Sequence, residues 1–543
     1  MTHALSNKLY FSRASISVAI VVTGLIMIAN IIWTLDKGLI FHDESWELLN
    51  YQAGAHTIDY SNWHRVLHFL YTDNLFHLRL ITFGIISSSA FLLGLAANRL
   101  LELPYPAWVI GILMIIFQFF LNSPVKLVPS YTNMNLVSIN MSVAAFIFFH
   151  IEKRKSLRVL ALVICSFFIS ILPFVLVTNV TVIGALFILL MVITERGKRW
   201  RYALVFTTSV LIYPAIYFVS IESPVLFWEK YREATLYLSM DADYGLFGLL
   251  KWHAKLMLHF IQFPAAVLLL AFLLEKKLNP YLQFLLKGVV ILLIALQLYK
   301  DSTFQFSQFP VTLWYVLLLA LLWQQRKQLW EDKIALAWVL FFSLLPYFAS
   351  LGTVVRFQLK ATAFFPYLAV TILYLLNRQQ DKRMMQIFAA LSLYCVLVFF
   401  SFNFRTGWSN YNVLNQKVRY EISDKKGVVY LEQYRVDRLK ELAPYLKNNP
   451  CVITSHENVW GYVYLLDSKP LYISFRFNPK FFYYFIKEHD VDQYAITFVE
   501  LNRKPFAEGF KDFLNGQQTP AHQLEKIFLS EFTIYKYKKT SDK

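Results

Sequence analysis

The chain places "ISVAIVVTGLIMIANIIWTL" at residues 16–35 and soon follows it with "FHDESWELLNYQ" at residues 41–52. The first stretch carries no charge over twenty residues, which is the length an α-helix needs to cross about 30 Å of hydrocarbon. The second stretch gathers Asp43, Glu44 and Glu47 next to that run. Together they predict a helix that spans a membrane and a carboxylate-bearing loop at the membrane surface.

The composition of the whole chain agrees with a membrane protein that has many spans. Hydrophobic residues make up 57% of the 543 residues and charged residues 16%, whereas a soluble domain carries about 25% charged residues. The first apolar run is too long for a signal peptide and reads as a retained anchor. Three cysteines in unrelated contexts suggest no disulfide and no metal-ligand spacing. We therefore expect no cofactor, and a divalent metal finds no support in the sequence.

Apolar runs mark thirteen candidate spans, which predicts an α-helical polytopic protein. Their expected positions are 16–35, 78–98, 105–121, 134–150, 158–176, 179–194, 202–220, 254–274, 281–298, 310–323, 334–350, 361–376 and 384–403. Several of these runs are short, so twelve or fourteen spans remain open.

The loop charges predict which side of the membrane each loop faces. If the N-terminus is cytoplasmic, residues 1–15 and the six inner loops hold 19 Lys and Arg. The short outer loops within 122–133, 299–309 and 351–360 hold 4. Short cytoplasmic loops carry an excess of basic residues, so this alternation favours an odd number of spans. It also explains the net charge of +17 without nucleic acid.

Two long outer loops and a polar C-terminal part complete the expected organisation. The loops cover residues 36–77 and 221–253, and both have patterns typical of amphipathic helices in the membrane interface. Residues 1–403 form the expected membrane module. Residues 404–543 mix short β-rich runs with helix-like ones and close on a hairpin, "EKIFLSEFTIYKYKK", which predicts a small external α/β domain.

Chemistry on the outer side has to use a donor that is available there. A sugar linked to a polyprenyl phosphate meets this need, because its tail stays in the lipid and its phosphate lies at headgroup level. Such a reaction requires a carboxylate to deprotonate the acceptor hydroxyl. Asp43 is the candidate base, and Glu44 is a candidate for a second catalytic carboxylate that assists Asp43. The alternative is that Asp43 only caps the helix "ESWELLNY".

Cations must also hold the departing phosphate. The candidates on the outer loops are Arg65, Lys126, Tyr131 and Arg356. The positive-inside bias discourages basic residues on these loops, so those present call for a reason. The alternative is that they anchor the chain to anionic headgroups, at about 1 kcal/mol for each basic side chain.

With these features the chain resembles the GT-C superfamily of integral membrane glycosyltransferases. It is similar in arrangement to the protein O-mannosyltransferases and to the bacterial enzyme that adds aminoarabinose to lipid A. The features that carry the resemblance are "HDESWELL" after the first span, "RLITFGIISSSAFLLGLAANRLL", "PSYTNMN" and the C-terminal α/β part. The resemblance implies that an acidic residue of the first outer loop is the base of an inverting reaction, here Asp43 beside Glu44. Metal-dependent members carry an acid in the second outer loop, and none lies between Asn122 and Asn133.

We therefore expect a glycosyltransferase of a bacterial inner membrane, with its C-terminal domain outside the cytoplasm. It is expected to move a sugar from a polyprenyl-phosphate donor to a glycan, lipid or protein of the cell envelope, such as lipopolysaccharide. Two alternatives stay open. A transporter or lipid flippase would need ionisable groups deep inside the spans, and these are scarce. An O-antigen polymerase or ligase usually places its large outer loop later in the chain.

Overall fold

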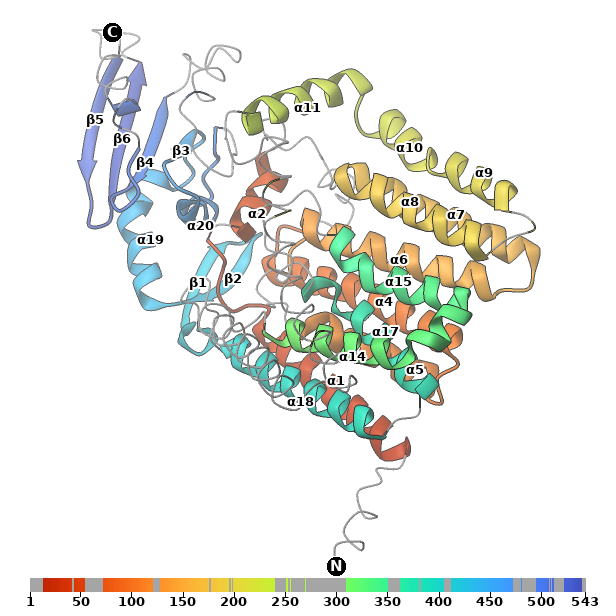
Figure 1. Ribbon diagram of the computed structural model, residues 1–543. Coiled ribbons are helices and arrows are strands. Elements are labelled where there is room, and N and C mark those ends of the chain that lie inside the picture. The colour runs from red at the N-terminus through yellow and green to blue at the C-terminus, as the bar shows by residue number, and fades with distance from the viewer. Residues whose placement is uncertain are drawn as a thin grey trace, which may run out of the picture.

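A computed structural model of the protein describes most of the chain. The described residues are 13–41, 43–53, 72–120, 127–174, 177–194, 199–239, 309–349, 362–379, 382–404, 412–471, 495–506 and 522–539, with the single positions 197, 251, 254, 269, 480, 508, 510 and 511. Figure 1 shows a bundle of helices with a group of strands at one end of it.

Helices make up the described part of the bundle. They are α1 (Arg13–Thr34), α4 (Leu75–Leu101), α5 (Ala107–Phe119), α6 (Tyr131–Ile151), α7 (Lys155–Ile171), α8 (Val177–Thr194), α9 (Arg199–Ser209), α10 (Ile212–Ser220), α14 (Phe309–Glu331), α15 (Lys333–Phe348), α17 (Phe365–Gln379) and α18 (Lys382–Phe404). Eleven predicted spans fall on these helices, and the predicted spans 254–274 and 281–298 lie outside the described residues. The mostly helical fold is therefore confirmed, and the count of thirteen spans stays a prediction.

One predicted span, 202–220, is broken in the structure. α9 ends at Ser209 and α10 begins at Ile212, with a turn between them. Pro214 has no N–H to donate to the carbonyl of Val210 four residues earlier, and the loss of this hydrogen bond favours a break in the helix here. The short helix α11 (Pro224–Ser239) follows and crosses the end of this part of the bundle (Figure 1).

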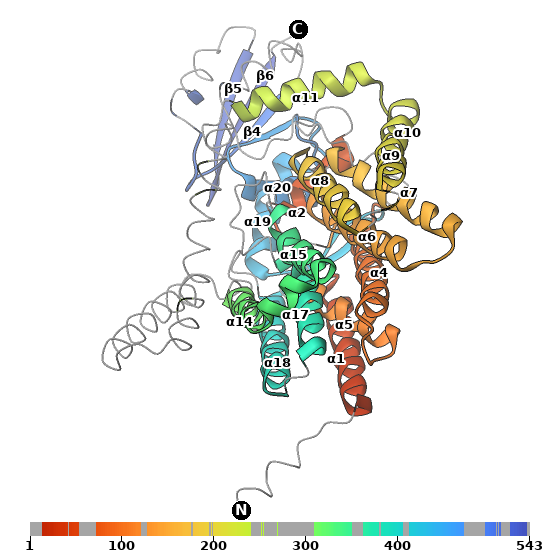
Figure 2. The same cartoon turned by 45° about the vertical axis from the view of Figure 1, so that its right-hand side comes forward.

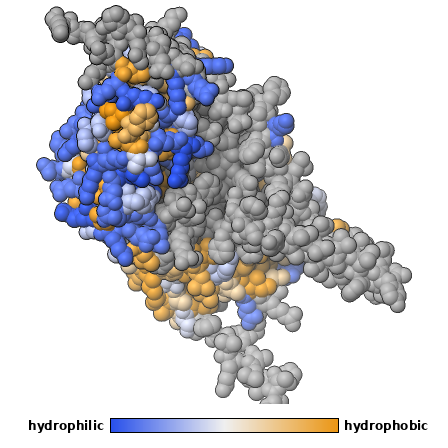
Figure 3. All heavy atoms as spheres, turned by 90° about the vertical axis from the view of Figure 1, so that its left-hand side faces the viewer, coloured by the Kyte–Doolittle hydropathy of each residue, from blue (hydrophilic) through white to orange (hydrophobic). Residues whose placement is uncertain are grey.

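Five helical stretches of the described chain are long and apolar enough to cross a membrane, which identifies an integral membrane protein. They are Ala14–Thr34, Leu75–Leu101, Thr132–Ile151, Lys155–Phe174 and Arg199–Ser220. Apolar side chains on α1 stay exposed, with Val18 at 62% and Leu25 at 61%, as lipid-facing residues do. Figure 3 shows hydrophilic side chains over the C-terminal strands and hydrophobic side chains gathered below them.

The described residues 412–539, here called the C-terminal region, contain two sheets. One is an antiparallel hairpin of β1 (Val418–Ser423) and β2 (Gly427–Leu431). The other has the strand order β3-β4-β6-β5, in which β3 and β4 are parallel and the other pairs antiparallel. Its strands are β3 (Val452–Thr454), β4 (Ile496–Leu501), β5 (His522–Phe528) and β6 (Phe532–Lys539), and two helices, α19 (Gln433–Leu446) and α20 (Trp460–Leu465), lie between β2 and β4. The predicted closing hairpin is confirmed as β5 and β6.

The C-terminal region and one end of the bundle share a single apolar core. This core joins Leu39 and Phe41 after α1, Leu75 and Leu78 at the start of α4, and Val128 before α6 to side chains of the C-terminal region. The loops after α1, before α4 and before α6 therefore meet at the same end of the bundle, as the alternation of loops predicts. The assignment of that end to the outside stays a prediction. The expected boundary at residue 404 falls beside 405–411, which lie outside the described residues.

An uncharged polar network ties four helices together inside the bundle. Asn140 of α6 donates to Ser89 Oγ of α4 and to Gln118 Oε1 of α5, both at 3.2 Å. Tyr367 of α17 donates to Asn140 Oδ1 at 2.8 Å, and Gln118 donates to the Ala363 carbonyl at 2.6 Å. Interhelical hydrogen bonds of this kind stabilise helix contacts in membranes, so the network fixes how α4, α5, α6 and α17 pack.

α4 and α5 approach so closely that only glycine fits at their crossing. A Cβ on Gly94 would lie 2.6 Å from the Gly111 Cα and 2.7 Å from the Ile110 carbonyl oxygen. Small residues at such crossings let two membrane helices pack backbone to backbone.

Replacing Gly94 by leucine should force α4 and α5 apart, because the new side chain has no space in the crossing. We expect a loss of about 1–3 kcal/mol or more of stability, measured as a lower melting temperature of the detergent-solubilised protein. Gly84→Leu on the same helix is the matched control, since a Cβ on Gly84 meets nothing within 4 Å. Equal melting temperatures for the two variants would contradict the close crossing.

Candidate functional site

The carboxylates singled out in the sequence lie on α2 (Asp43–Ala53), a short helix between the bundle and the C-terminal region (Figures 1 and 2). The turn before the helix is held by hydrogen bonds to residue 40. Ser45 donates its backbone N–H and its hydroxyl to the Ile40 carbonyl, at 3.1 and 3.0 Å. The Ile40 N–H donates to Glu44 Oε2 at 3.0 Å. These bonds set the direction in which α2 leaves the membrane-spanning helix α1.

A buried ion pair between Glu44 and Arg79 connects α2 to α4. Arg79 Nε donates to Glu44 Oε1 at 2.7 Å, and Nη2 donates to Oε2 at 2.8 Å. The same guanidinium donates to the carbonyls of Leu35 at 2.6 Å and Gly38 at 2.9 Å. Both side chains are 0% exposed. A buried pair of charges is tolerated only when its geometry is good and further hydrogen bonds compensate for the lost water, and here every guanidinium nitrogen and both carboxylate oxygens take part in a hydrogen bond.

Arg79 was not among the candidates that the sequence suggested. The signal was an arginine near the start of a 27-residue apolar helix, a position where a charge is costly and implies a partner. The sequence could not name that partner, because Glu44 lies in a different element far back along the chain. Only the fold brings the two residues together.

The structure describes the other predicted site residues only in part. Asp43 is the first residue of α2 and Tyr131 the first residue of α6, but their side chains lie outside what the structure describes. Arg65, Lys126 and Arg356 also lie outside the described residues. Both roles suggested for Asp43, proposed base and helix cap, stay predictions.

The motif "PSYTN" orders the start of α6. Ser130 is the N-cap of that helix, and its hydroxyl accepts from the Asn133 N–H at 3.2 Å. The Asn133 side chain donates to the Val128 carbonyl at 2.7 Å. Val128 belongs to the core shared with the C-terminal region, so the motif attaches α6 to the end of the bundle where α2 lies.

α2 is buried on two opposite faces. Leu48 and Leu49 pack into the core shared with the C-terminal region. Asp43, Glu47 and Asn50 follow the spacing i, i+4 and i+7, which places them on one face of a helix. Glu47 is 3% exposed and Asn50 is 1% exposed, so both described side chains of this polar face are enclosed by protein.

The segment 36–41, which connects α1 to α2, is held by the C-terminal region. The Gly38 N–H donates to the Tyr430 carbonyl at 2.7 Å, and the Tyr430 N–H donates to the Asp36 carbonyl at 2.9 Å. The Gly461 N–H donates to the Phe41 carbonyl at 2.9 Å. The Phe41 ring also meets Tyr462 edge to face at 4.6 Å and the Arg435 guanidinium at 4.1 Å. The segment 36–41 is therefore fixed by side chains and backbone from the far end of the chain.

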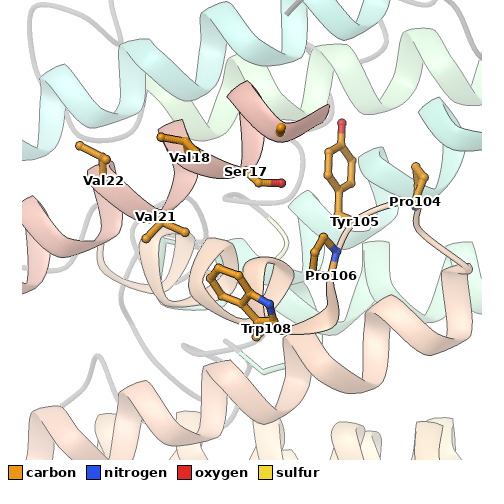
Figure 4. A pocket seen from close by; sticks show the side chains of 9 residues that line it. Ser17, Val18, Val21, Val22, Pro104, Tyr105, Pro106 and Trp108 are labelled. Carbon is orange, nitrogen blue, oxygen red and sulfur yellow. The ribbon is translucent and has the colours of Figure 1, made fainter. Parts of the chain in front are cut away.

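An apolar pocket lies away from this site. It has a volume of about 500 Å³ and is formed by the first half of α1 and the connection between α4 and α5. Figure 4 shows Val18, Val22 and Trp108 around it. Its walls come from the end of α1 opposite to α2, so it has no part in the carboxylate site. Among the described residues, no cluster of His, Cys, Asp and Glu could hold a metal ion.

Comparisons with known proteins find similarity to solved structures. No family model matches the chain, and no curated protein matches it. Among solved structures, the chain is similar to the crystal structure of ArnT from Cupriavidus metallidurans bound to undecaprenyl phosphate, with a TM-score of 0.39 and 11% identity. The match covers 96% of this chain and 97% of that chain.

Removing one partner of the buried ion pair should strongly destabilise the protein. Glu44→Leu leaves the Arg79 guanidinium without a negative partner, and Arg79→Met leaves the Glu44 carboxylate without a positive partner. Each change should cost about 3–5 kcal/mol, measured by thermal unfolding in detergent. The double variant Glu44→Leu/Arg79→Met should lose less than the sum of the two. Single variants as stable as the wild type would contradict the pairing.

Adding one methyl group at residue 461 should loosen the segment 36–41. A Cβ on Gly461 would lie 2.3 Å from the Phe41 ring, so Gly461→Ala should displace Phe41 and cost about 1–3 kcal/mol. Hydrogen exchange at the Gly38 and Tyr430 amides should become faster. Gly184→Ala on α8 is the control, since nothing lies within 4 Å there. Unchanged exchange in Gly461→Ala would show that this contact does not hold the segment.

Proposed function

We propose that the chain is a membrane glycosyltransferase that moves a sugar from a polyprenyl-phosphate carrier to a hydroxyl of a cell-envelope glycan, lipid or protein. The observation that supports this best is the enclosed polar face of α2, which begins at Asp43 and is fixed by the ion pair between Glu44 and Arg79. A general base has to be held in a fixed position, within hydrogen-bonding reach of the proton it removes. In this proposal α2 holds Asp43 in a fixed position beyond the end of the membrane-spanning helix α1.

In the proposed reaction Asp43 accepts the proton of the acceptor hydroxyl. The oxygen then forms a bond to the anomeric carbon of the sugar while the bond from that carbon to the phosphate oxygen breaks. The electron pair of the broken bond leaves with the polyprenyl phosphate. One direct displacement inverts the anomeric centre, and the transferred proton stays on Asp43 until it is released to water.

Glu44 is assigned a positioning role in this proposal. Its two oxygens already accept from Arg79 and from the Ile40 N–H, so its carboxylate is engaged in holding α2. Arg79 is engaged in the same way and is not a candidate for the phosphate. We propose Arg65, Lys126, Tyr131 and Arg356 for that role, because they lie on loops that the charge pattern places with α2 on the outer side of a bacterial inner membrane.

Replacing Asp43 tests the proposed base. Asp43→Asn keeps the size of the side chain and removes its basicity, so transfer should fall by at least about 10²-fold, as expected for the loss of a general base. The assay follows the release of undecaprenyl phosphate from undecaprenyl-phosphate sugars by mass spectrometry, with an envelope extract as acceptor.

Asp36→Asn is the matched control for this assay. Asp36 lies in the same loop, and its partly exposed side chain pairs with Lys37 at 3.1 Å, so transfer should stay near the wild-type rate. Full transfer by both Asp43→Asn and Asp43→Ala would remove Asp43 from the mechanism.

A further inference from the structure

We propose that Asn50 recognises the sugar of the donor by hydrogen bonding to two of its hydroxyl groups. This inference rests on the proposed function and adds a residue that binds the transferred group. Asn50 lies on the polar face of α2, two helical turns after Asp43. A carboxamide can both donate to and accept from hydroxyl groups, which is why a sugar is the proposed ligand.

The first support is the state of the Asn50 amide. A carboxamide has two N–H donors and an oxygen with two lone pairs. Asn50 is 1% exposed, and neither its Nδ2 nor its Oδ1 has a hydrogen-bond partner among the described residues. Buried polar groups without partners destabilise a fold and are rare in native proteins. An asparagine in such a place indicates that a ligand completes its hydrogen bonds.

The second support is the position of Asn50 relative to Asp43. Seven residues of an α-helix rise by about 10 Å, and the spacing of seven returns the side chain to the face of Asp43. Leu48 and Leu49 hold the opposite face in the shared core, and the Glu44–Arg79 pair fixes the first turn. α2 therefore cannot rotate Asn50 away from the face that carries the proposed base. A sugar whose anomeric carbon lies near Asp43 can extend its far hydroxyls along this face.

The third support is chemical selectivity. A phosphate is bound best by cations, whose charge-assisted hydrogen bonds are stronger than those of an amide. An isoprenoid chain needs apolar walls. Neighbouring sugar hydroxyls each donate and accept, so a carboxamide can donate to one and accept from the other. Of the three parts of the donor, the sugar is the one that suits Asn50.

The test compares how two lipids stabilise the purified protein against heat. Undecaprenyl phosphate alone reports binding of the carrier, and a panel of undecaprenyl-phosphate hexoses and pentoses reports the additional binding of a sugar. In the wild type, at least one sugar lipid should raise the melting temperature more than the bare lipid does. Asn50→Leu should lose this sugar-dependent increment and keep the shift caused by the bare lipid.

Asn50→Leu without lipid should melt at the same temperature as the wild type or above it, because it removes a buried amide that has no partner. In the transfer assay its kcat/KM for the sugar lipid should fall at least ten-fold. Asn50→Asp keeps the shape and the acceptor oxygens but loses the N–H donors, so it should also lose the increment. It serves as the second variant if Asn50→Leu does not fold.

The controls separate this inference from the proposed function. Asp43→Asn should keep the sugar-dependent increment while losing transfer. The buried Asn98 of α4 donates to the Tyr105 carbonyl at 3.1 Å, so Asn98→Leu should lose stability while keeping the increment. An unchanged sugar-dependent increment in Asn50→Leu, or in Asn50→Asp where Asn50→Leu does not fold, would overturn the role of Asn50. If the Asn50 variants contradict the inference but Asp43→Asn still loses transfer, only the role of Asn50 is removed and the proposed function is unaffected.

Discussion

The Arg79 guanidinium determines how the helices are held together at the end of the bundle where α2 lies. Arg79 places a positive charge in the apolar helix α4, and its side chain is 0% exposed. Protein groups therefore have to accept hydrogen bonds from its N–H groups. Glu44 supplies the counter-charge, and two carbonyls of the loop after α1 accept two further hydrogen bonds. The first span, α2 and α4 are thereby fixed relative to one another. The proposed base, Asp43, therefore begins a helix that is held in place by the ion pair between Glu44 and Arg79.

The same end of the bundle depends on the C-terminal region. Leu48 and Leu49 of α2 share their core with side chains from β2, α19 and α20, and the backbone of Tyr430 pairs with the segment before α2. The C-terminal region is therefore part of the support for α2. Deeper in the bundle the situation is different. Around Asn140 the buried polar groups of α4, α5, α6 and α17 are uncharged and bond to one another. Such an interior favours a fixed scaffold over a path for ions.

The sequence was informative where one segment determines its own structure. Apolar length predicted the helices from α1 to α18 because a membrane requires an internally bonded helix of that length, and the alternation in "EKIFLSEFTIYKYKK" predicted β5 and β6. The acids after the first span pointed to α2. The β1–β2 hairpin and helix α19 were not anticipated. Contacts between distant segments could not be predicted: nothing near Glu44 names Arg79, and nothing near Phe41 names Gly461. Pro214 was a readable signal for the break between α9 and α10.

The pairing of Tyr430 with the segment at Gly38 has a consequence for biosynthesis. The earliest loop to leave the ribosome cannot complete its core until residues from β2 and α20 have been synthesised and have reached the same side of the bilayer. During that interval the apolar side chains of α2 lack their partners, and contacts so distant along the chain form slowly. Premature termination before residue 430 would thus leave a set of inserted spans with an unfinished first loop.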